Sequence, residues 1–266
     1  MRDPLSDPQR QRFSRQILLP SFGFDGQEAL LNASVLMIGV GGLGCAAAQY
    51  LVAAGVGCLT LVDFDRVDVS NLHRQVLYGD ADKGRFKTES AVAALRRLNA
   101  GVELRSIAKK LADEALFVEI KDADVVMDCS DNLATRQQLN RLCKKAQVPL
   151  VSGAAVRLEG QVAVFPMTQD SPCYHCFSHT FGEQQLSCVE SGVLGPVVGI
   201  VGAFQALEAI KVISGLGVTL AGRVMLLDAT YSEWQSYQIE RWADCPVCGS
   251  ESSSGGGGGS GNVASD

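Results

Sequence analysis

VLMIGVGGLGCAAAQYLVAAGVGCLTLVDFD, which spans residues 35–65, decides the fold of this protein. The stretch predicts a buried strand, a glycine-rich turn, a helix of small residues and a second strand that ends in acids. The turn, GVGGLG at residues 39–44, matches the pattern G-x-G-x-x-G, whose glycines let the backbone and a helix N-terminus approach phosphate. Asp63 lies 19 residues beyond the last glycine, where such sites carry the acid that binds ribose. The stretch therefore predicts a nucleotide site, although glycines that only pack a helix on a sheet give the same pattern.

Strands and helices are predicted to alternate through about residue 155. The strands are expected at residues 34–40, 59–62, 102–107, 124–129 and 148–156, and the helices at 25–32, 43–54, 85–98, 113–120 and 132–146. This alternation predicts a Rossmann-like α/β fold, in which a doubly wound, mostly parallel sheet has helices on both faces. Further strands at 160–165, 223–227 and 233–239 are expected to continue the sheet in antiparallel fashion. Asp25, with Glu28 three residues later, is expected to cap the first helix.

The composition indicates one compact domain over residues 1–249, followed by a flexible Gly/Ser-rich tail at 250–266. The chain has 266 residues, 47% of them hydrophobic, and a net charge of −6, which argues against a generic nucleic-acid binder. The N-terminal sequence MRDPLSDPQR has no apolar core typical of a signal peptide, so we expect a cytoplasmic protein. The apolar run Val193–Ile213 contains Gln205, Glu208 and Lys211, which favours a buried helix over a membrane span.

Cationic side chains follow the predicted ribose acid. The segment SNLHRQ at residues 70–75 contains Arg74, and Lys87 comes shortly after it. A nucleoside triphosphate needs such cations because several negative charges must be neutralised in one place. The alternative is that Arg74 and Lys87 are solvated surface residues without a ligand.

Two polar residues follow the strand predicted at 124–129. Asn132 is expected to cap the next helix, which leaves Asp131 available to bind Mg²⁺. The alternative is that Asp131 itself is the helix cap.

The nine cysteines are expected to be reduced thiols or metal ligands. Two C-x-x-C pairs supply the four thiolates of a structural, tetrahedral zinc site: Cys173, Cys176, Cys245 and Cys248. Such a site would join the C-terminus to the body of the protein. Two unrelated pairs of buried thiols are the alternative. The cysteines expected to be small core residues are Cys45, Cys58, Cys129 and Cys143.

Taken together, the motifs GVGGLG, DFD, SNLHRQ, Lys87 and DCSDN resemble the ubiquitin-activating-enzyme superfamily, in its HesA/MoeB/ThiF branch. The resemblance covers about residues 8–249 and includes RFSRQ at residues 12–16, which contains Arg15. Segments 24–30, 151–161 and 188–192 are more similar to the adenylyltransferases of molybdenum cofactor biosynthesis than to those of thiamin biosynthesis.

The resemblance implies that ATP is bound over the glycine loop and that a small β-grasp carrier protein ending in Gly-Gly attacks its α-phosphate. An acyl-adenylate then forms for sulfur transfer, with a separate protein as sulfur donor. The residues implied in nucleotide binding are Gly41, Gly42, Gly44, Asp63, Asp65, Ser70, Asn71, Leu72, His73, Arg74, Gln75, Lys87, Asp131 and Asn132. Arg74, Lys87 and Mg²⁺ on Asp131 would stabilise the phosphates, and Arg15 would reach the partner's site in a homodimer. The resemblance places the nucleotide-binding part at about residues 25–155 and the carrier-binding and zinc part at about 156–249.

Other functions remain open from the residues alone. The same chemistry could serve the thiamin carrier or a carboxylate on tRNA. An NAD-dependent oxidoreductase would explain the glycine loop but would leave Arg15, Arg74, Lys87 and Asp131 without a task. A catalytically silent binding module is a further alternative, and the residues that argue against it are Arg15, Asp63, Arg74, Lys87 and Asp131. Cys188 is a candidate for a role in sulfur or acyl transfer, as in the thiamin branch.

Overall fold

The computed structural model describes residues 5–181 and 192–249, so Cys188 lies outside the described residues. The described chain forms one eight-stranded sheet in the order β3-β2-β1-β4-β5-β6-β7-β8. The parallel strands are β1 (Ser34–Ile38), β2 (Cys58–Val62), β3 (Glu103–Ile107), β4 (Val125–Asp128) and β5 (Leu150–Val156). The antiparallel strands are β6 (Glu159–Phe165), β7 (Arg223–Asp228) and β8 (Glu233–Gln238). The predicted fold class is confirmed, and the strand order reverses between β1 and β4, where such sheets bind ligands.

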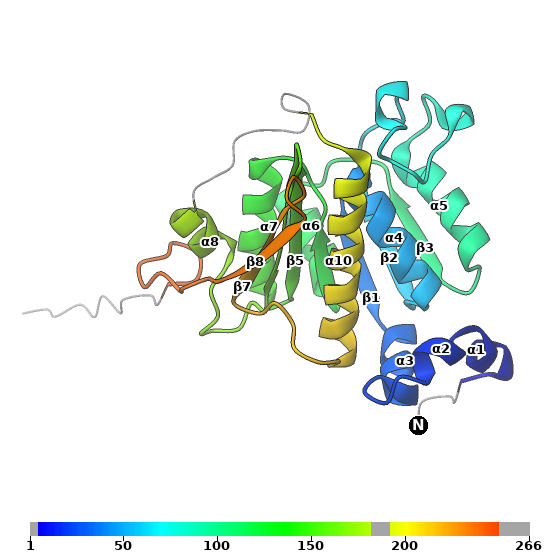
Figure 1. Ribbon diagram of the computed structural model, residues 1–266, viewed down its shortest axis with the longest axis horizontal. Helices are drawn as coiled ribbons and strands as arrows, with labels where there is room; N and C mark the ends of the chain where they lie inside the picture. Colours follow the sequence, from blue (N-terminus) through cyan, green and yellow to red (C-terminus); the bar gives the residue numbers. More distant parts are fainter. Residues whose placement is uncertain (1–4, 182–191, 250–266) are drawn as a thin grey trace, which may run out of the picture.

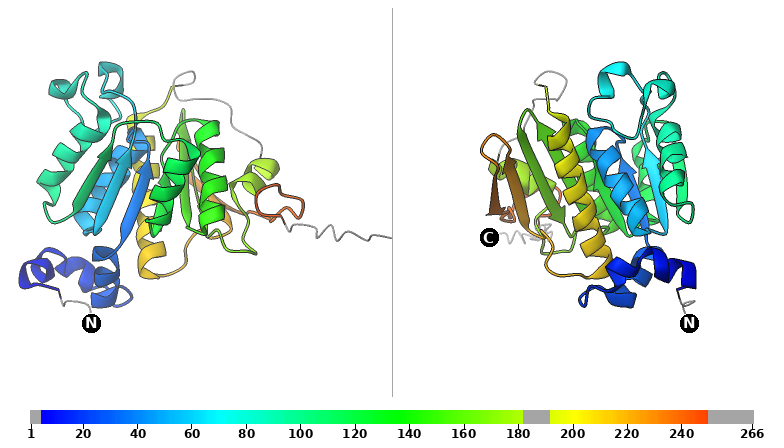
Figure 2. Two further views of the ribbon diagram at one scale, coloured as in Figure 1. Left: turned by 180° about the vertical axis from the view of Figure 1, so that it is seen from behind. Right: turned by 45° about the vertical axis from the view of Figure 1, so that its right-hand side comes forward.

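Helices cover both faces of the sheet (Figures 1 and 2). One face carries α4 (Gly42–Ala54), α5 (Lys87–Leu98) and α10 (Gly195–Ser214), and the other carries α6 (Asp113–Lys121), α7 (Leu133–Ala146) and α8 (Tyr174–Phe181). Short helices α1 (Asp7–Arg12), α2 (Ser14–Ile17) and α3 (Gly23–Leu31) lie at the end of the molecule where β1 begins (Figure 1). Two 3₁₀ turns, η1 (Val69–Asn71) and η2 (Asp80–Asp82), connect β2 to α5.

Alternation along β1 explains the two-sided core. Val35 and Met37 pack with the α4 and α10 side, whereas Leu36 and Ile38 pack with the α6 and α7 side. Side chains of a strand point to opposite faces in turn, so a strand that is apolar at every position must be covered on both sides.

The first predicted helix begins earlier than expected. Asp25 lies inside the first turn of α3, because the helical hydrogen bonds already begin where the Gly26 N–H donates to the Phe22 carbonyl. The residue at the N-cap position is Phe22, which makes no side-chain hydrogen bond, so the expected cap at Asp25 is wrong.

Helix α10 is long and apolar enough to cross a membrane by length and composition. Its Val201, Gln205 and Glu208 are buried against the protein, as expected of a core helix. A Cβ atom on Gly202 would lie 2.3 Å from the Leu43 carbonyl oxygen, so glycine lets α10 pack directly on α4.

Candidate active site

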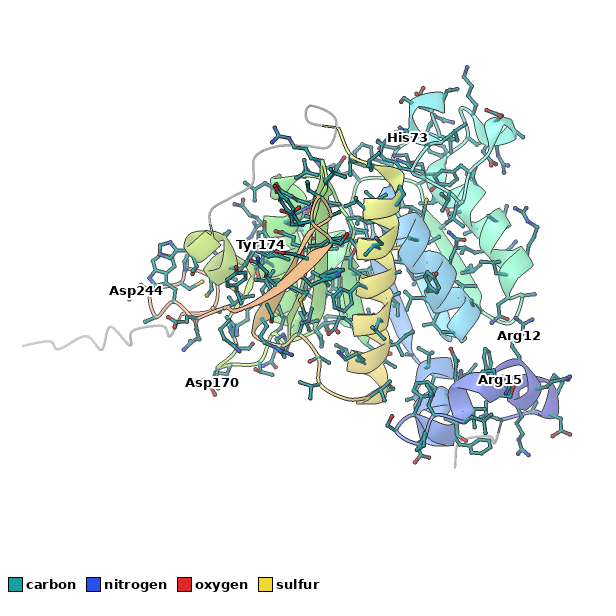
Figure 3. All side chains as sticks on the ribbon, viewed as in Figure 1. Arg12, Arg15, His73, Asp170, Tyr174 and Asp244 are labelled. Atoms are coloured by element: carbon teal, nitrogen blue, oxygen red, sulfur yellow. The ribbon has the colours of Figure 1, made fainter. Side chains whose placement is uncertain are left out.

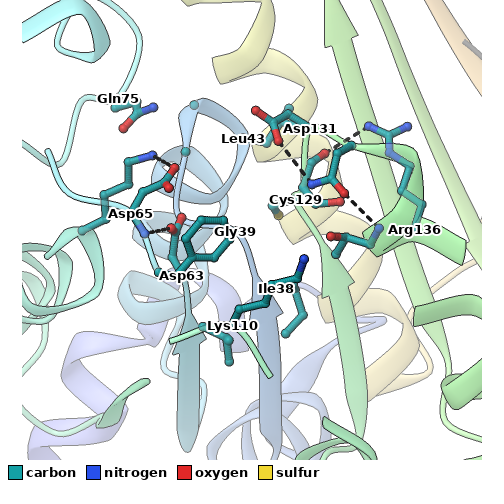
Figure 4. A pocket seen from close by; sticks show the side chains of 18 of the residues that line it. Ile38, Gly39, Leu43, Asp63, Asp65, Gln75, Lys110, Cys129, Asp131 and Arg136 are labelled. Carbon is teal, nitrogen blue, oxygen red and sulfur yellow. Dashed lines mark hydrogen bonds and ion pairs between the residues drawn. The ribbon is translucent and has the colours of Figure 1, made fainter. Parts of the chain in front are cut away.

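A pocket of about 610 Å³ lies at the carboxyl ends of the parallel strands (Figure 4). This size suits a small-molecule ligand. The predicted site residues that line it are Gly41, Gly42, Asp63, Asp65, Asn71, Arg74, Gln75, Lys87, Asp131 and Asn132. Figure 4 shows Asp63 and Asp65 on one side and Asp131 on the other. The strand order thus brings together residues that lie far apart in the sequence.

The glycine loop packs tightly against its own helix. A Cβ atom on Gly44 would lie 2.2 Å from the Gly39 carbonyl oxygen, and Gly39 has a φ of 91°, which favours glycine. Gly44 does not line the pocket, so it acts by allowing α4 to start close under the loop. Helix α4 therefore directs its N-terminus at the pocket, where free N–H groups favour an anion.

Asp63 is fixed by two backbone donors. Its Oδ2 atom accepts the Val40 N–H at 2.8 Å, and its Oδ1 atom accepts the Asp65 N–H at 2.8 Å. Burial raises the pKa of Asp63, while the nearby charge of Lys87 and these two hydrogen bonds act in the opposite direction. The carboxylate is therefore rigid and partly dehydrated.

Lys87 and Asp65 form an ion pair in which Nζ lies 2.8 Å from Oδ2. The lysine side chain is only 8% exposed, whereas the aspartate side chain is 50% exposed. Lys87 is the first residue of α5 and lines the pocket. The ammonium is thus already oriented before any phosphate is bound.

Arg74 is held by the segment that follows η1. Its Nη1 atom donates to the Ser70 carbonyl at 3.0 Å and lies 2.8 Å from His73 Nε2. Ser70, in turn, donates through both N–H and Oγ to Asp68, and these hydrogen bonds lower the pKa of Asp68. Ser70 and His73 do not line the pocket but contact the arginine that does.

Gln75 is a buried polar residue that offers a hydrogen-bond acceptor in the pocket. It is 3% exposed, lines the pocket, and its Oε1 atom has no hydrogen-bond partner among the described residues. Leu72 packs against the apolar core and does not reach the pocket.

The structure shows which of Asp131 and Asn132 caps the following helix. The Asn132 side chain caps α7 by accepting the Thr135 N–H at 2.9 Å. Asp131 is exposed and makes no ion pair with a described residue. The preceding Asp128 is buried and bonded to Ser130 and Ser152, so it supports the loop from below.

Arg15 lies far from the pocket of its own chain. Figure 3 shows it among the N-terminal helices, at the opposite end of the molecule from His73. Arg15 lies in α2 and does not line the pocket.

The sequence interpretation missed four cations that line the pocket: Arg66, Lys109, Lys110 and Arg136. Lys109 and Lys110 follow the end of β3, and Arg136 lies in the first turn of α7. The lysines could have been found by the rule that identified Asp131, because they also follow a parallel strand. Arg136 donates to the Ser130 carbonyl at 3.0 Å, while its Nε atom is buried without a partner among the described residues.

The four cysteines of the two C-x-x-C pairs meet in space. Their sulfur atoms lie within 4.8 Å of one another and all four residues are buried, although Cys173 and Cys245 are 72 positions apart in the sequence. Cys173 and Cys176 stand at the start of α8, and Cys245 and Cys248 lie in a C-terminal turn. Burial, reinforced by the charges of Cys176 and Cys245, raises the pKa of Cys173 to about 11. Four thiolates therefore need a cation at this position, and a closed set of four sulfurs fits structural zinc.

Two histidines beside the cysteines have another contact. The rings of His175 and His179 stack on Trp242 at centroid distances of 5.9 and 4.1 Å. The group of candidate metal ligands contains the four cysteines and neither histidine. The other predicted core cysteines are buried, except Cys58, which is half-buried.

Comparison with known proteins agrees with this geometry. The model of the ThiF family matches residues 13–247. Molybdopterin-synthase adenylyltransferase of Escherichia coli (strain K12) is 49% identical over 245 residues, which are 92% of this chain and 98% of that protein. Sulfur carrier protein ThiS adenylyltransferase of the same organism is 44% identical over 245 residues, covering 92% and 97% of the two chains.

Among solved structures, E. coli MccB with MccA-N7isoASN has a TM-score of 0.80 at 23% identity, covering 91% of this chain and 76% of that one. This likeness shows a shared fold. The family match over nearly the whole described chain carries the assignment, and the chain belongs to the ThiF family.

Proposed function

We propose that this protein adenylates the C-terminal glycine of a small ubiquitin-like sulfur carrier, the small subunit of a molybdopterin synthase. ATP is the adenylyl donor, pyrophosphate leaves, and the acyl-adenylate serves sulfur transfer in molybdenum cofactor biosynthesis. The observation that carries the proposal is 49% identity to a molybdopterin-synthase adenylyltransferase over 98% of that protein's length. The resemblance to the thiamin-carrier enzyme, at 44%, makes that carrier the second candidate.

The pocket suits ATP because the ends of neighbouring strands carry groups for both the ribose and the phosphates. Asp63 after β2 is placed to bind ribose, and the glycine loop after β1 faces the phosphates. Arg74 and Lys87 supply positive charge beside that loop. Preorganised charge of this kind is most effective where negative charge develops, here on the α-phosphate and on the leaving pyrophosphate.

Asp131 is the residue that would hold Mg²⁺. Magnesium in phosphate sites uses one or two carboxylates, together with water and the phosphates themselves. An exposed carboxylate that lines the pocket fits this requirement. A larger set of protein ligands is not needed, and among the described residues only the four cysteines form a group of three or more candidate ligands. When bound, the ion would neutralise phosphate charge.

The carrier tail would enter over the antiparallel strands. A second pocket on β5 to β8 adjoins the first, since both include Ala154 and Val156. The second pocket is lined by Glu159, Asp228 and Glu233, which lie in register on three neighbouring strands. An extended peptide could therefore run along this face and place its C-terminal carboxylate at the glycine loop.

A homodimer would explain the position of Arg15. Helix α10 exposes Ile200 and Leu207, and Phe204 between them packs edge-on against the exposed Trp234 at 5.4 Å. An exposed apolar stripe of this kind is typical of an interface. In the proposed dimer, Arg15 reaches the pocket of the partner.

Subunit mixing tests this arrangement. Arg15→Ala and Lys87→Met homodimers should each be inactive, while exchange between them should restore about a quarter of wild-type activity, because half of the dimers then contain one intact site. No restoration after verified exchange would show that Arg15 acts in its own chain, whereas an active Arg15→Ala homodimer would show that Arg15 is not needed.

The decisive experiment mixes the protein with ATP, Mg²⁺ and one Gly-Gly carrier at a time, and measures the mass of the carrier. A gain equal to one AMP on the molybdopterin-synthase carrier supports the proposal. The same gain on the thiamin carrier alone would move the protein to that branch. The absence of an adduct on any carrier, together with tight NAD binding, would favour an oxidoreductase. A cytoplasmic location stays a prediction.

A further inference from the structure

Tyr78 is a buried residue behind the nucleotide pocket that the proposed chemistry does not use. Its hydroxyl donates a hydrogen bond of 2.7 Å to the carbonyl of Val40, the residue between the first two glycines of the loop. Burial raises the pKa of Tyr78 far above its ordinary value, so the hydroxyl keeps its proton. The side chain is therefore a permanent donor to the loop.

The backbone of Val40 links this tyrosine to the ribose acid. The N–H of Val40 donates to Asp63 Oδ2 at 2.8 Å, while the carbonyl of the same residue accepts from Tyr78. The thiol of Cys45 is a second, weaker donor to that carbonyl at 3.5 Å. The N–H and the carbonyl belong to the two peptide groups that meet at the Val40 Cα atom, so a hydroxyl that holds the carbonyl restricts ψ of Val40 and thereby the backbone that carries the N–H to Asp63.

Tyr78 also belongs to the segment that carries Arg74. The N–H of Tyr78 donates to the Gln75 carbonyl at 3.1 Å, and the N–H groups of Arg74 and Gln75 donate to the Asn71 carbonyl at 3.1 and 3.0 Å. These consecutive turns connect Tyr78 to the backbone beneath Arg74. A single hydroxyl thus joins the glycine loop to the cationic segment on the other side of the pocket.

We propose that Tyr78 is a positioning residue of the nucleotide site: its hydroxyl restrains the backbone of Val40, and thereby aims the Asp63 carboxylate at the ribose of ATP and holds the Arg74 segment against the loop. The inference rests on the proposed function, since it names the groups that orient the ribose and phosphate contacts. Tyr78 would act through other residues, without contacting ATP or the carrier.

The test compares Tyr78→Phe with the wild type in equilibrium binding of ATP and of 2′,3′-dideoxy-ATP, which lacks both ribose hydroxyls. The variant should bind ATP about 5- to 100-fold more weakly, the range expected when a buried carbonyl loses its hydrogen bond. Binding of the dideoxy nucleotide should weaken less, so the ratio of the two affinities should fall toward one. The KM for the carrier should not change.

A purely structural role would lower the melting temperature without changing that ratio. Tyr50→Phe is the matched control, because Tyr50 lies on α4, the helix that follows the loop, and its side chain is exposed. It should behave as the wild type. In an Asp63→Asn background, Tyr78→Phe should have no further effect on the ratio, because the group that it orients is gone.

A folded Tyr78→Phe protein whose ATP affinity and affinity ratio both stay within twofold of the wild type overturns the inference. If that variant does not fold, Cys45→Ala, which removes the weaker donor to the same carbonyl, must shift the ratio in the same direction, and an unchanged ratio overturns the inference equally. Both binding measurements need no carrier. A wild type that binds ATP with ribose discrimination but adenylates no carrier would therefore refute the proposed function alone.

Discussion

Replacing Lys87 by methionine separates catalysis from stability at one position. Methionine keeps most of the apolar stem of this side chain, which is 8% exposed, and removes only the ammonium. The lost ion pair, with Nζ 2.8 Å from Asp65 Oδ2, is weak because the carboxylate is 50% exposed and solvent screens it. Such pairs contribute about 1 kcal/mol or less, so Lys87→Met should lower the free energy of unfolding by no more than that.

The effect on adenylation should be several times larger. A preorganised group that stabilises developing charge contributes about 10²- to 10³-fold in kcat, which corresponds to roughly 3–4 kcal/mol. We therefore expect carrier-dependent ATP–pyrophosphate exchange to fall at least about a hundredfold in Lys87→Met, while urea unfolding changes little. The two measurements are made on the same purified protein.

Lys211→Met is the matched control for this change. Lys211 pairs with Glu208 at 2.6 Å on α10, away from the pocket, and the glutamate is fully buried. Removing this lysine leaves a buried charge unpaired, which costs about 3 kcal/mol of stability. Exchange per folded molecule should stay near wild type. If Lys87→Met keeps exchange within tenfold of wild type, or if both variants lose the same activity, the role given to Lys87 is wrong.

Three further outcomes are expected. Asp131→Ala should reduce pyrophosphate exchange at least about a hundredfold while the free energy of unfolding stays nearly unchanged. Asn132→Ala should instead lower the free energy of unfolding by about 1 kcal/mol, because the helix cap is lost. If urea unfolding shows the loss of stability in Asp131→Ala and not in Asn132→Ala, the two roles are exchanged. Because the pKa of Asp63 is raised in the folded protein, this residue stabilises the fold most below its ordinary pKa, and the contribution is lost as pH rises through the raised value. The free energy of unfolding of the wild type minus that of Asp63→Asn should therefore be larger at pH 4 than at pH 7. The opposite pH dependence would contradict burial as the cause of the raised pKa. Elemental analysis should find close to one zinc per chain and much less in Cys176→Ser, with a lower melting temperature; under half an equivalent in gently prepared wild type would count against the site.

Periodicity alone was sufficient for most of the fold. The continuous apolar runs of β1 and β4 and the amphipathic α7 agree with their predicted positions within a few residues. The start of α3 was missed because Asp25 has the right residue type for a cap, whereas the preceding turn around Phe22 already supplies helical hydrogen bonds. Local chemistry identifies which residues can cap, but the backbone path decides which one does.

The apolar run Val193–Ile213 also contains the spacing Gly195-x-x-x-Gly199, which is typical of helices that make close backbone contacts. Gly195 makes the close approach, since a Cβ there would lie 2.6 Å from the His73 carbonyl oxygen, but nothing lies within 4 Å of such an atom on Gly199. The second close contact of α10 is made by Gly202. Which glycines are required depends on the helix and loop packed against them, and the sequence does not contain that information.

The sequence by itself determined the chemistry available: a glycine loop, a ribose acid, cations for phosphate and four thiols for a metal. These follow from residue types and short spacings, which local backbone geometry fixes. Only the tertiary structure decided that the two cysteine pairs meet within 4.8 Å, that Lys109, Lys110 and Arg136 share the pocket, and that the Tyr78 hydroxyl holds the Val40 carbonyl. Contacts between residues far apart in the chain depend on strand order and helix packing, which arise from burying the whole apolar surface at once rather than from any one segment.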